Sequence, residues 1–179
     1  MAGHNKWSQI KRKKGVEDAK RSKLFAMLGR AITLESRKAT GNKESPGLKK
    51  AIENARKENM PNDNIDRAIA KGMGAGAESF EEVLYEAYGP GGAALIIEGM
   101  TDSKNRTNQE IKHILSDHGG SLGGPGSVTW GFRKTESGWK STMPLEIPES
   151  DMEKLAELIE KLEEHADVKN VFTNINEED

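Results

Sequence analysis

Apolar residues recur at helical spacing in three stretches of the first 75 residues. The first stretch predicts a long amphipathic helix over residues 16–39, which Gly41 ends. A second helix is predicted after Pro46 and a third after Pro61, and Gly72 is expected to stop the third. Because three apolar stripes of this kind can bury one another, this part of the chain is predicted to form a three-helix module.

Alternation of apolar and polar residues predicts strands after a flexible linker over residues 72–79. A hairpin is predicted from residues 83–88 and 93–99, with the turn sequence GPGG between them. A second hairpin is predicted from residues 127–132 and 139–147 around the turn TESG. The change from helical to strand periodicity indicates that a second domain starts after the linker.

Two further helices are predicted among these strands, each from a capping box in which Ser or Thr precedes Glu by three residues. Thr107 with Glu110 predicts the start of the first helix, and Ser150 with Glu153 predicts the start of the second. A last strand is predicted over residues 168–175. The resulting order is strand, helix, strand, strand, helix, strand, which is the order of a ferredoxin-like α/β sandwich.

The predicted fold class is therefore α+β, with a basic three-helix module over residues 1–75 and a ferredoxin-like α/β sandwich over residues 76–179. The first domain contains 18 Lys and Arg against 8 Asp and Glu, whereas the second contains 9 against 21. The net charge of −2 thus conceals two parts of opposite sign. A polyanionic partner is expected for the first part, and a protein partner is one hypothesis for the acidic second part.

The N-terminal arm KWSQIKRKKG combines basic residues with a single aromatic residue, Trp7. Such a combination can neutralise phosphates while an exposed ring stacks on bases. The alternative is a solvated basic terminus in which Trp7 folds onto the helices. The candidate nucleic-acid-binding residues are Lys6, Trp7, Lys11, Arg12, Lys13, Lys14, Lys20, Arg21 and Lys23.

The segment ENMPNDNIDRAI, between the second and third predicted helices, is a second candidate site. It places an apolar residue at a helix junction, followed by proline and polar residues. Two interpretations stay open: a loop that contacts a partner, or a tight turn in which the methionine staples two helices together. The candidate loop residues are Met60, Pro61, Asn62, Asp63 and Asn64.

The sequence predicts no enzyme and no cofactor. The chain has no Cys and only four scattered His, so no metal site is expected. The glycine-rich residues 119–126 lack the Lys-Ser/Thr ending of a phosphate-binding loop and are interpreted as a structural turn. No apolar run approaches the roughly 20 residues that span a bilayer, so we expect a cytoplasmic protein without a membrane partner.

Several motifs in the correct order resemble the YebC/PmpR family, and together they cover essentially the whole chain. They are MAGHNKW, KWSQIKRKKGVEDAKRSKLF, ENMPNDNIDRAIAKG, YEAYGPGGAALIIE, TDSKNRT and GGSLGGPGSVTWGF. The resemblance implies a helical N-terminal domain followed by α/β domains. Members are catalogued as probable transcriptional regulators that bind DNA. Bacterial members and the mitochondrial translational activators of cytochrome c oxidase subunit I look like ribosome-associated factors for synthesis through proline-rich stretches.

Typical members of that family are longer, because a third α/β domain is inserted between the two strands that TESG joins here. The chain is therefore interpreted as a short form that lacks this domain. The leading hypothesis for function is a translation factor that binds ribosomal RNA, and the alternative is a DNA-binding transcriptional regulator. No helix-turn-helix with a short turn and a base-reading helix is evident in the sequence, which favours RNA.

Overall fold

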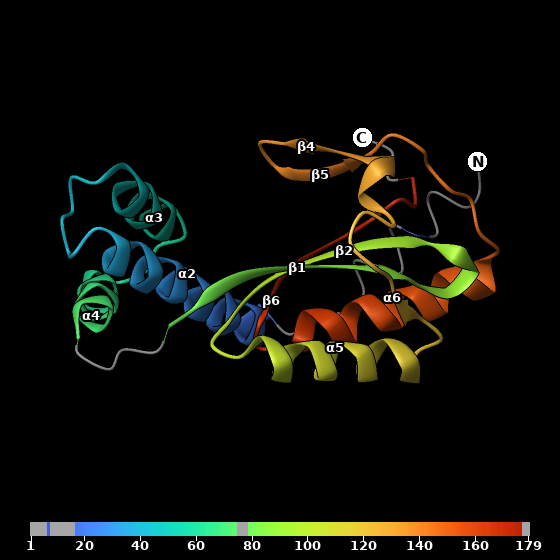
Figure 1. The fold of residues 1–179 in the computed structure, drawn as a ribbon, viewed down its shortest axis with the longest axis horizontal. Helices are drawn as coiled ribbons and strands as arrows, with labels where there is room; N and C mark the ends of the chain where they lie inside the picture. The colour runs from blue at the N-terminus through green and yellow to red at the C-terminus, as the bar shows by residue number, and fades with distance from the viewer. Residues whose placement is uncertain (1–6, 8–16, 75–78, 177–179) are drawn as a thin grey trace. The chain divides into compact units, whose positions relative to one another are not determined.

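The structure, a computed structural model, describes residue 7 and residues 17–74 and 79–176. The chain folds as two compact units. The helical unit contains Val16–Glu82 and Met100–Ser103, and the α/β unit contains Trp7, Val83–Gly99 and Lys104–Asp179. The elements of both units are shown in Figure 1, and the predicted α+β class is confirmed.

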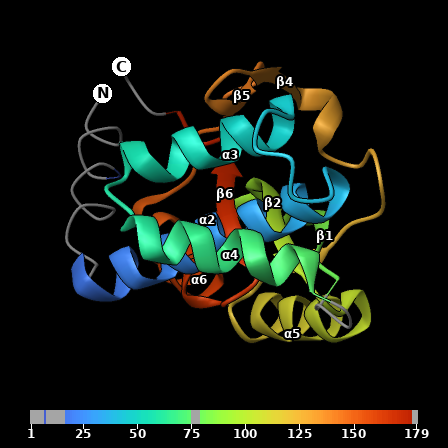
Figure 2. The same ribbon diagram turned by 90° about the vertical axis from the view of Figure 1, so that its left-hand side faces the viewer.

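The three predicted helices of the helical unit are confirmed as α2 (Glu17–Lys38), α3 (Pro46–Lys57) and α4 (Asn62–Met73). Figure 2 views this unit, in which α2 packs against both α3 and α4, and these two contact each other less. The apolar stripes meet in one core, because each helix turns its small or aliphatic residues inward. The buried residues of this core are Ile32, Leu48, Ala51, Ile52, Ala55, Met60, Ile65, Ala68 and Ile69.

The sequence predicts that Gly72 stops the third helix. This is wrong by one residue, because α4 continues to Met73. The glycine instead lets α4 approach α2 closely: a Cβ at this position would lie 2.5 Å from the carbonyl oxygen of Thr33. Two hydroxyls of α2 also reach α4. Ser36 Oγ donates to the carbonyl of Ile69 at 2.8 Å, and Thr33 Oγ1 donates to the carbonyl of Ala68 at 3.2 Å.

The α/β unit is built on a four-stranded sheet with the strand order β3-β1-β2-β6. The strands are β1 (Glu81–Tyr88), β2 (Ala94–Thr101), β3 (Ser121–Leu122) and β6 (Val168–Thr173). The first predicted hairpin is therefore confirmed, and a short 3-10 helix, η1 (Pro90–Gly92), forms its turn. Both faces of β2 are buried, because Leu95 and Ile97 belong to one core and Ile96 belongs to another.

The helices α5 (Lys104–Asp117) and α6 (Glu149–Glu164) cover one face of this sheet (Figure 1). Their apolar faces pack with Leu95 and Ile97 in the larger core. On the opposite face lies a separate two-stranded sheet of β4 (Phe132–Thr135) and β5 (Gly138–Ser141). Phe132 of this hairpin packs against Ile96.

Two details of the predicted α/β sandwich are corrected. Residues 127–132 do not form a strand, because they include a 3-10 helix, η2 (Thr129–Gly131), and β4 starts at Phe132. The β4–β5 hairpin forms its own sheet, and β1 lies beside β3 in the main sheet.

Neither predicted capping box forms. α5 already begins at Lys104, which places Thr107 inside the helix, where its hydroxyl donates to Asp167 at 2.7 Å. Pro148 is the N-cap of α6, and no side-chain cap hydrogen bond forms there.

Candidate nucleic-acid interface

Trp7 is not the exposed stacking residue that its basic neighbours suggested. Its side chain is 1% exposed and belongs to the core of the α/β unit, together with residues of β2, α5 and α6. The alternative, in which Trp7 folds onto the helical module, is also corrected by this position. The other predicted residues of the arm lie outside the described residues: Lys6, Lys11, Arg12, Lys13 and Lys14.

The first turns of α2 carry the remaining basic residues predicted from the arm. Lys20 and Arg21 are exposed, and Lys23 is half-buried. The guanidinium of Arg21 lies 5.4 Å from the ring centroid of Phe25, so this charge rests on an aromatic face. The structure thus keeps two of these three cations at the surface, where they can meet a polyanion.

The exposed face of α3 carries four basic residues around one exposed Glu53, a net positive surface that the sequence analysis did not single out. Lys49, Lys50, Arg56 and Lys57 are all exposed. Seven residues separate Lys49 from Arg56 and Lys50 from Lys57, so each pair lies on one side of the helix two turns apart. In the part of the chain that the structure describes, these four side chains form no ion pair and no hydrogen bond.

Two other basic residues of the helical unit form ion pairs. Lys38 Nζ lies 2.7 Å from Glu35 Oε1, and Lys43 Nζ lies 3.4 Å from Asp66 Oδ1. The pKa of Lys38 is raised, chiefly by its hydrogen bond to Glu35. A count of charges along the sequence does not show which cations are paired. The seven-residue spacing on α3 could have shown that its basic residues share one side of the helix.

The MPNDN segment divides into a buried and an exposed part. Met60 is 6% exposed and lies in the same core as Ile65, which is the arrangement of a hydrophobic staple at the start of α4. Pro61, Asn62 and Asp63 are exposed. Met60 is therefore packed in the core, and Pro61, Asn62 and Asp63 face solvent.

At the start of α4, Asn64 is held by its own helix. Arg67 Nη2 donates to Asn64 Oδ1 at 2.7 Å, and Arg67 Nε donates to the carbonyl of Asp63 at 3.2 Å. The candidate loop is thus an ordered helix start with exposed polar groups.

Residues 58–61 join α3 to α4, so a helix pair with a short turn is present after all. In a helix-turn-helix the second helix reads bases. Here the exposed charged residues of that helix are Asp63, Asp66, Arg67 and Lys71, so the helix carries no net positive charge to meet phosphates. The basic helix of the pair is the first one, α3.

The glycine-rich residues 119–126, predicted to be a turn, include the short strand β3, and the backbone from Gly126 onward binds a carboxylate of the protein itself. Glu86 accepts hydrogen bonds from the N–H groups of Gly126 at 2.6 Å, Val128 at 2.8 Å and Thr129 at 2.9 Å. Burial raises the pKa of Glu86, but these hydrogen bonds outweigh it and the net pKa is lowered from 4.5. These three amides are therefore occupied and do not bind a phosphate.

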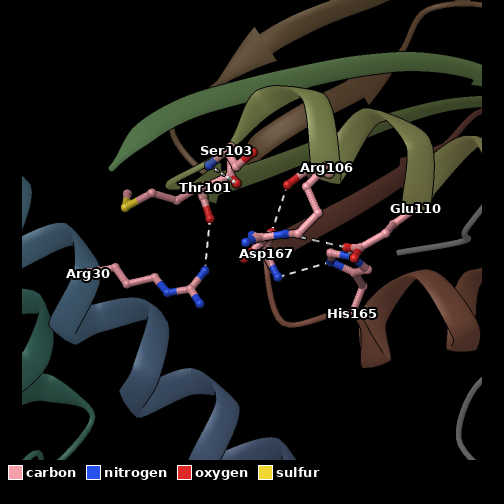
Figure 3. A network of polar contacts seen from close by, with 9 residues as sticks. Arg30, Thr101, Ser103, Arg106, Glu110, His165 and Asp167 are labelled. Carbon is pink, nitrogen blue, oxygen red and sulfur yellow. Dashed lines mark hydrogen bonds and ion pairs between the residues drawn. The ribbon is translucent and has the colours of Figure 1, made fainter. Parts of the chain in front are cut away.

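A polar network ties the start of α5 to the segment before β6 (Figure 3). Arg106 Nη2 and Thr107 Oγ1 each donate to Asp167 Oδ2 at 2.7 Å. His165 Nδ1 accepts the Asp167 N–H at 3.1 Å, so its Nε2 is the donor to Glu110 Oε2 at 2.6 Å. Glu110, His165 and Asp167 lie close enough to share a cation, but Arg106 already supplies a positive charge to both carboxylates. The network therefore serves structure.

No helix among the described residues is long and apolar enough to cross a membrane.

Two family profiles match the chain. One, described as the TACO1/YebC protein N-terminal domain, matches residues 5–75. The other, described as the TACO1/YebC second and third domain, matches in two segments, residues 80–137 and 131–175. The two segments overlap at the β4–β5 hairpin, where the sequence led us to place a missing domain.

Individual proteins and one solved structure are also similar to this chain. A protein of Syntrophus aciditrophicus is 57% identical over 140 residues, which are 76% of this chain and 56% of that protein. One of Petrotoga mobilis is 44% identical over 183 residues, which are 97% of this chain and 70% of that protein. Both are named "Probable transcriptional regulatory protein". The crystal structure of a conserved hypothetical protein from Aquifex aeolicus matches with a TM-score of 0.79 at 31% identity, covering 90% of this chain and 93% of that one.

Proposed function

Because the chain belongs to the TACO1/YebC family, we propose that it is a nucleic-acid-binding regulator of gene expression that docks on RNA through its helical unit. The relatives are named as regulatory proteins and not as enzymes. The observation that carries the proposal is the exposed face of α3, defined by Lys49, Lys50, Arg56 and Lys57. The chain spans 56% to 70% of the first two relatives, so their names support a regulatory role and do not fix a target.

The α3 face is suited to phosphates. Its four cations project from one helix whose opposite side is buried, so the backbone is already ordered and only the side chains lose freedom when they bind. Since they have no carboxylate partner in the described part of the chain, binding a phosphate breaks no ion pair. Displacement of counterions from the nucleic acid would then supply the binding free energy.

The target that we favour is ribosomal RNA, which would make the protein a cytoplasmic translation factor. In this proposal α3 contacts phosphates and α4 does not read bases. Contacts to the backbone alone suit recognition of a folded RNA. Assistance to synthesis through proline-rich stretches is the finer role that the family resemblance implies. In this proposal the exposed Pro61, Asn62 and Asp63 would contact the ribosome beside the α3 face.

A DNA-binding transcriptional regulator is the second candidate. Two observations favour it: the short turn between α3 and α4, and the names of the relatives. On DNA, the acidic residues at the start of α4 would have to lie away from the groove.

Two binding experiments with the full chain separate these candidates. The first is sedimentation with ribosomes, and the second is filter binding to its own promoter DNA. We expect co-sedimentation that the variant Lys49→Glu/Lys50→Glu loses. The matched variant Lys112→Glu/Lys154→Glu makes the same charge change on exposed residues of α5 and α6 and should still sediment. Tight promoter binding without sedimentation would overturn the RNA proposal in favour of DNA.

A further inference from the structure

The α/β unit presents an exposed aromatic surface beside its glycine-rich loop. The side chain of Trp130, in η2, is 70% exposed, and that of Tyr88, at the end of β1, is 39% exposed. Trp130 Nε1 donates to the carbonyl of Ser127 at 2.8 Å, and Tyr88 Oη donates to the same oxygen at 3.0 Å. Two aromatic rings are thus anchored at one carbonyl group and remain open to solvent.

This surface is ordered before any ligand arrives. The hydrogen bond to Ser127 fixes the edge of the Trp130 indole, and the carboxylate of Glu86 fixes the loop backbone on either side. The exposed residues before Ser127 are Gly124, Pro125 and Gly126, none of which has a long side chain that could cover a ring. An aromatic side chain held in this way loses little conformational entropy on binding.

Basic residues follow the aromatic surface on the β4–β5 hairpin. Arg133 and Lys140 pair directly across the two strands, and both are exposed. Lys134 instead turns to the main sheet, where it lies 3.1 Å from Glu98, so Arg133 and Lys140 point to the other side.

We propose that Trp130, Arg133 and Lys140 form a binding surface for single-stranded nucleic acid, with a base stacked on Trp130 and the adjoining phosphates on the two cations. An aromatic face accepts any unpaired base, and basic residues beside it follow the backbone. Two exposed basic residues, Arg133 and Lys140, lie on one side of this hairpin within the acidic second domain, which favours a polyanion over an acidic or neutral protein partner. The surface is independent of the α3 face.

The test uses the full chain and a fluorescently labelled 12-nucleotide RNA, single-stranded or paired with its complement. Trp130→Ala should weaken binding of the single strand roughly ten- to a hundredfold, as expected for loss of one stacked base. Trp130→Phe should retain most of the affinity. The duplex should bind all three proteins equally, because its bases are not available for stacking. Thermal unfolding of the variants serves as the control for folding.

The charge requirement is tested separately. Arg133→Glu should weaken binding of the single strand, whereas Lys112→Glu, an equal charge change on α5, should have little effect. Unchanged binding of the single strand by Trp130→Ala would overturn the proposal. So would an equal loss for the duplex, or a purified protein partner that needs Trp130 while RNA does not. Loss of binding through the α3 face would weaken both RNA forms, so failure of the proposed function is distinguishable.

Discussion

The helical unit and the α/β unit use their charged side chains differently. In the α/β unit three carboxylates maintain internal structure: Glu86 binds the glycine-rich loop, Glu98 binds the β4–β5 hairpin, and Asp167 binds α5. In the helical unit the cations of α3 face solvent without a partner in the described part of the chain, and hydroxyls such as Ser36 connect the helices. Charged side chains therefore hold the structure together in the α/β unit, whereas on α3 they are available to bind a partner.

This difference shows that the net charge of a domain is a poor measure of what it can bind. Some of the carboxylates in residues 76–179 accept hydrogen bonds within the protein and are not available to a partner. The hypothesis that this domain recruits a protein partner therefore depends on its other acidic residues. The positive charge of α3, by contrast, is wholly at the surface.

The largest expected effect is that of Trp7→Ala. Because the ring is fully buried in the core of the α/β unit, we expect the free energy of unfolding to fall by about 3–5 kcal/mol. Trp130→Ala is the matched control, since that side chain is 70% exposed and its loss should cost about 1 kcal/mol or less. Urea denaturation measures both. Equal, small effects would mean that Trp7 belongs to the arm and not to the core.

Glu86→Gln should destabilise the protein by about 1–3 kcal/mol at neutral pH, because an amide replaces a carboxylate that three backbone N–H groups bind. The pKa of Glu86 is lowered from 4.5 in the folded chain, so its contribution is present above pH 4.5 and is lost as the pH falls through the lower folded-state pKa. The variant should therefore lose less stability than the parent as the pH falls below 4.5.

Exposed Glu136→Gln is the control for this variant. If Glu86→Gln and Glu136→Gln give the same pH profile as the parent, the carboxylate of Glu86 does not hold the loop.

Gly72→Ala should destabilise the helical unit by about 1–2 kcal/mol. The new methyl group would lie 2.5 Å from a backbone oxygen of α2 and force the helices apart, which outweighs the better helix propensity of Ala. Gly29→Ala in α2 is the opposite case, because nothing lies within 4 Å of its Cβ position. That variant should gain about 0.5–1 kcal/mol. Thermal unfolding that shifts in the same direction for both variants would refute the close approach of α4 to α2.

Much of the fold could be predicted because its signals are local. The apolar spacing and the prolines at residues 46 and 61 define α2, α3 and α4. The GPGG turn likewise defines the hairpin of β1 and β2. The predictions were wrong where contacts between residues far apart in the sequence determine the structure. Thr107 resembles a cap in the sequence, but Asp167, sixty residues later, takes its hydroxyl.

The candidate site could be predicted only in part, for the same reason. A basic arm around one tryptophan is typical of a nucleic-acid contact, yet a core formed by residues after 83 buries Trp7. The availability of a cation depends on where its acidic neighbours lie after folding. Asp66 reaches Lys43, and no carboxylate in the described part of the chain reaches Lys49 or Arg56. Only the periodic spacing on α3 was visible in advance.

The most direct test of the account is the salt dependence of RNA binding by the full chain between 50 and 200 mM salt, a range in which phosphate contacts are strongly weakened. We predict that Lys49→Glu/Lys50→Glu binds more weakly and lowers the slope of log K against log salt by about 1–2, as loss of two phosphate contacts requires. Its thermal stability should equal that of the parent, since both side chains are exposed. Lys112→Glu/Lys154→Glu should keep the parental slope. Equal slopes for both double variants, or an unchanged slope for the α3 variant, would contradict the claim that this face binds nucleic acid.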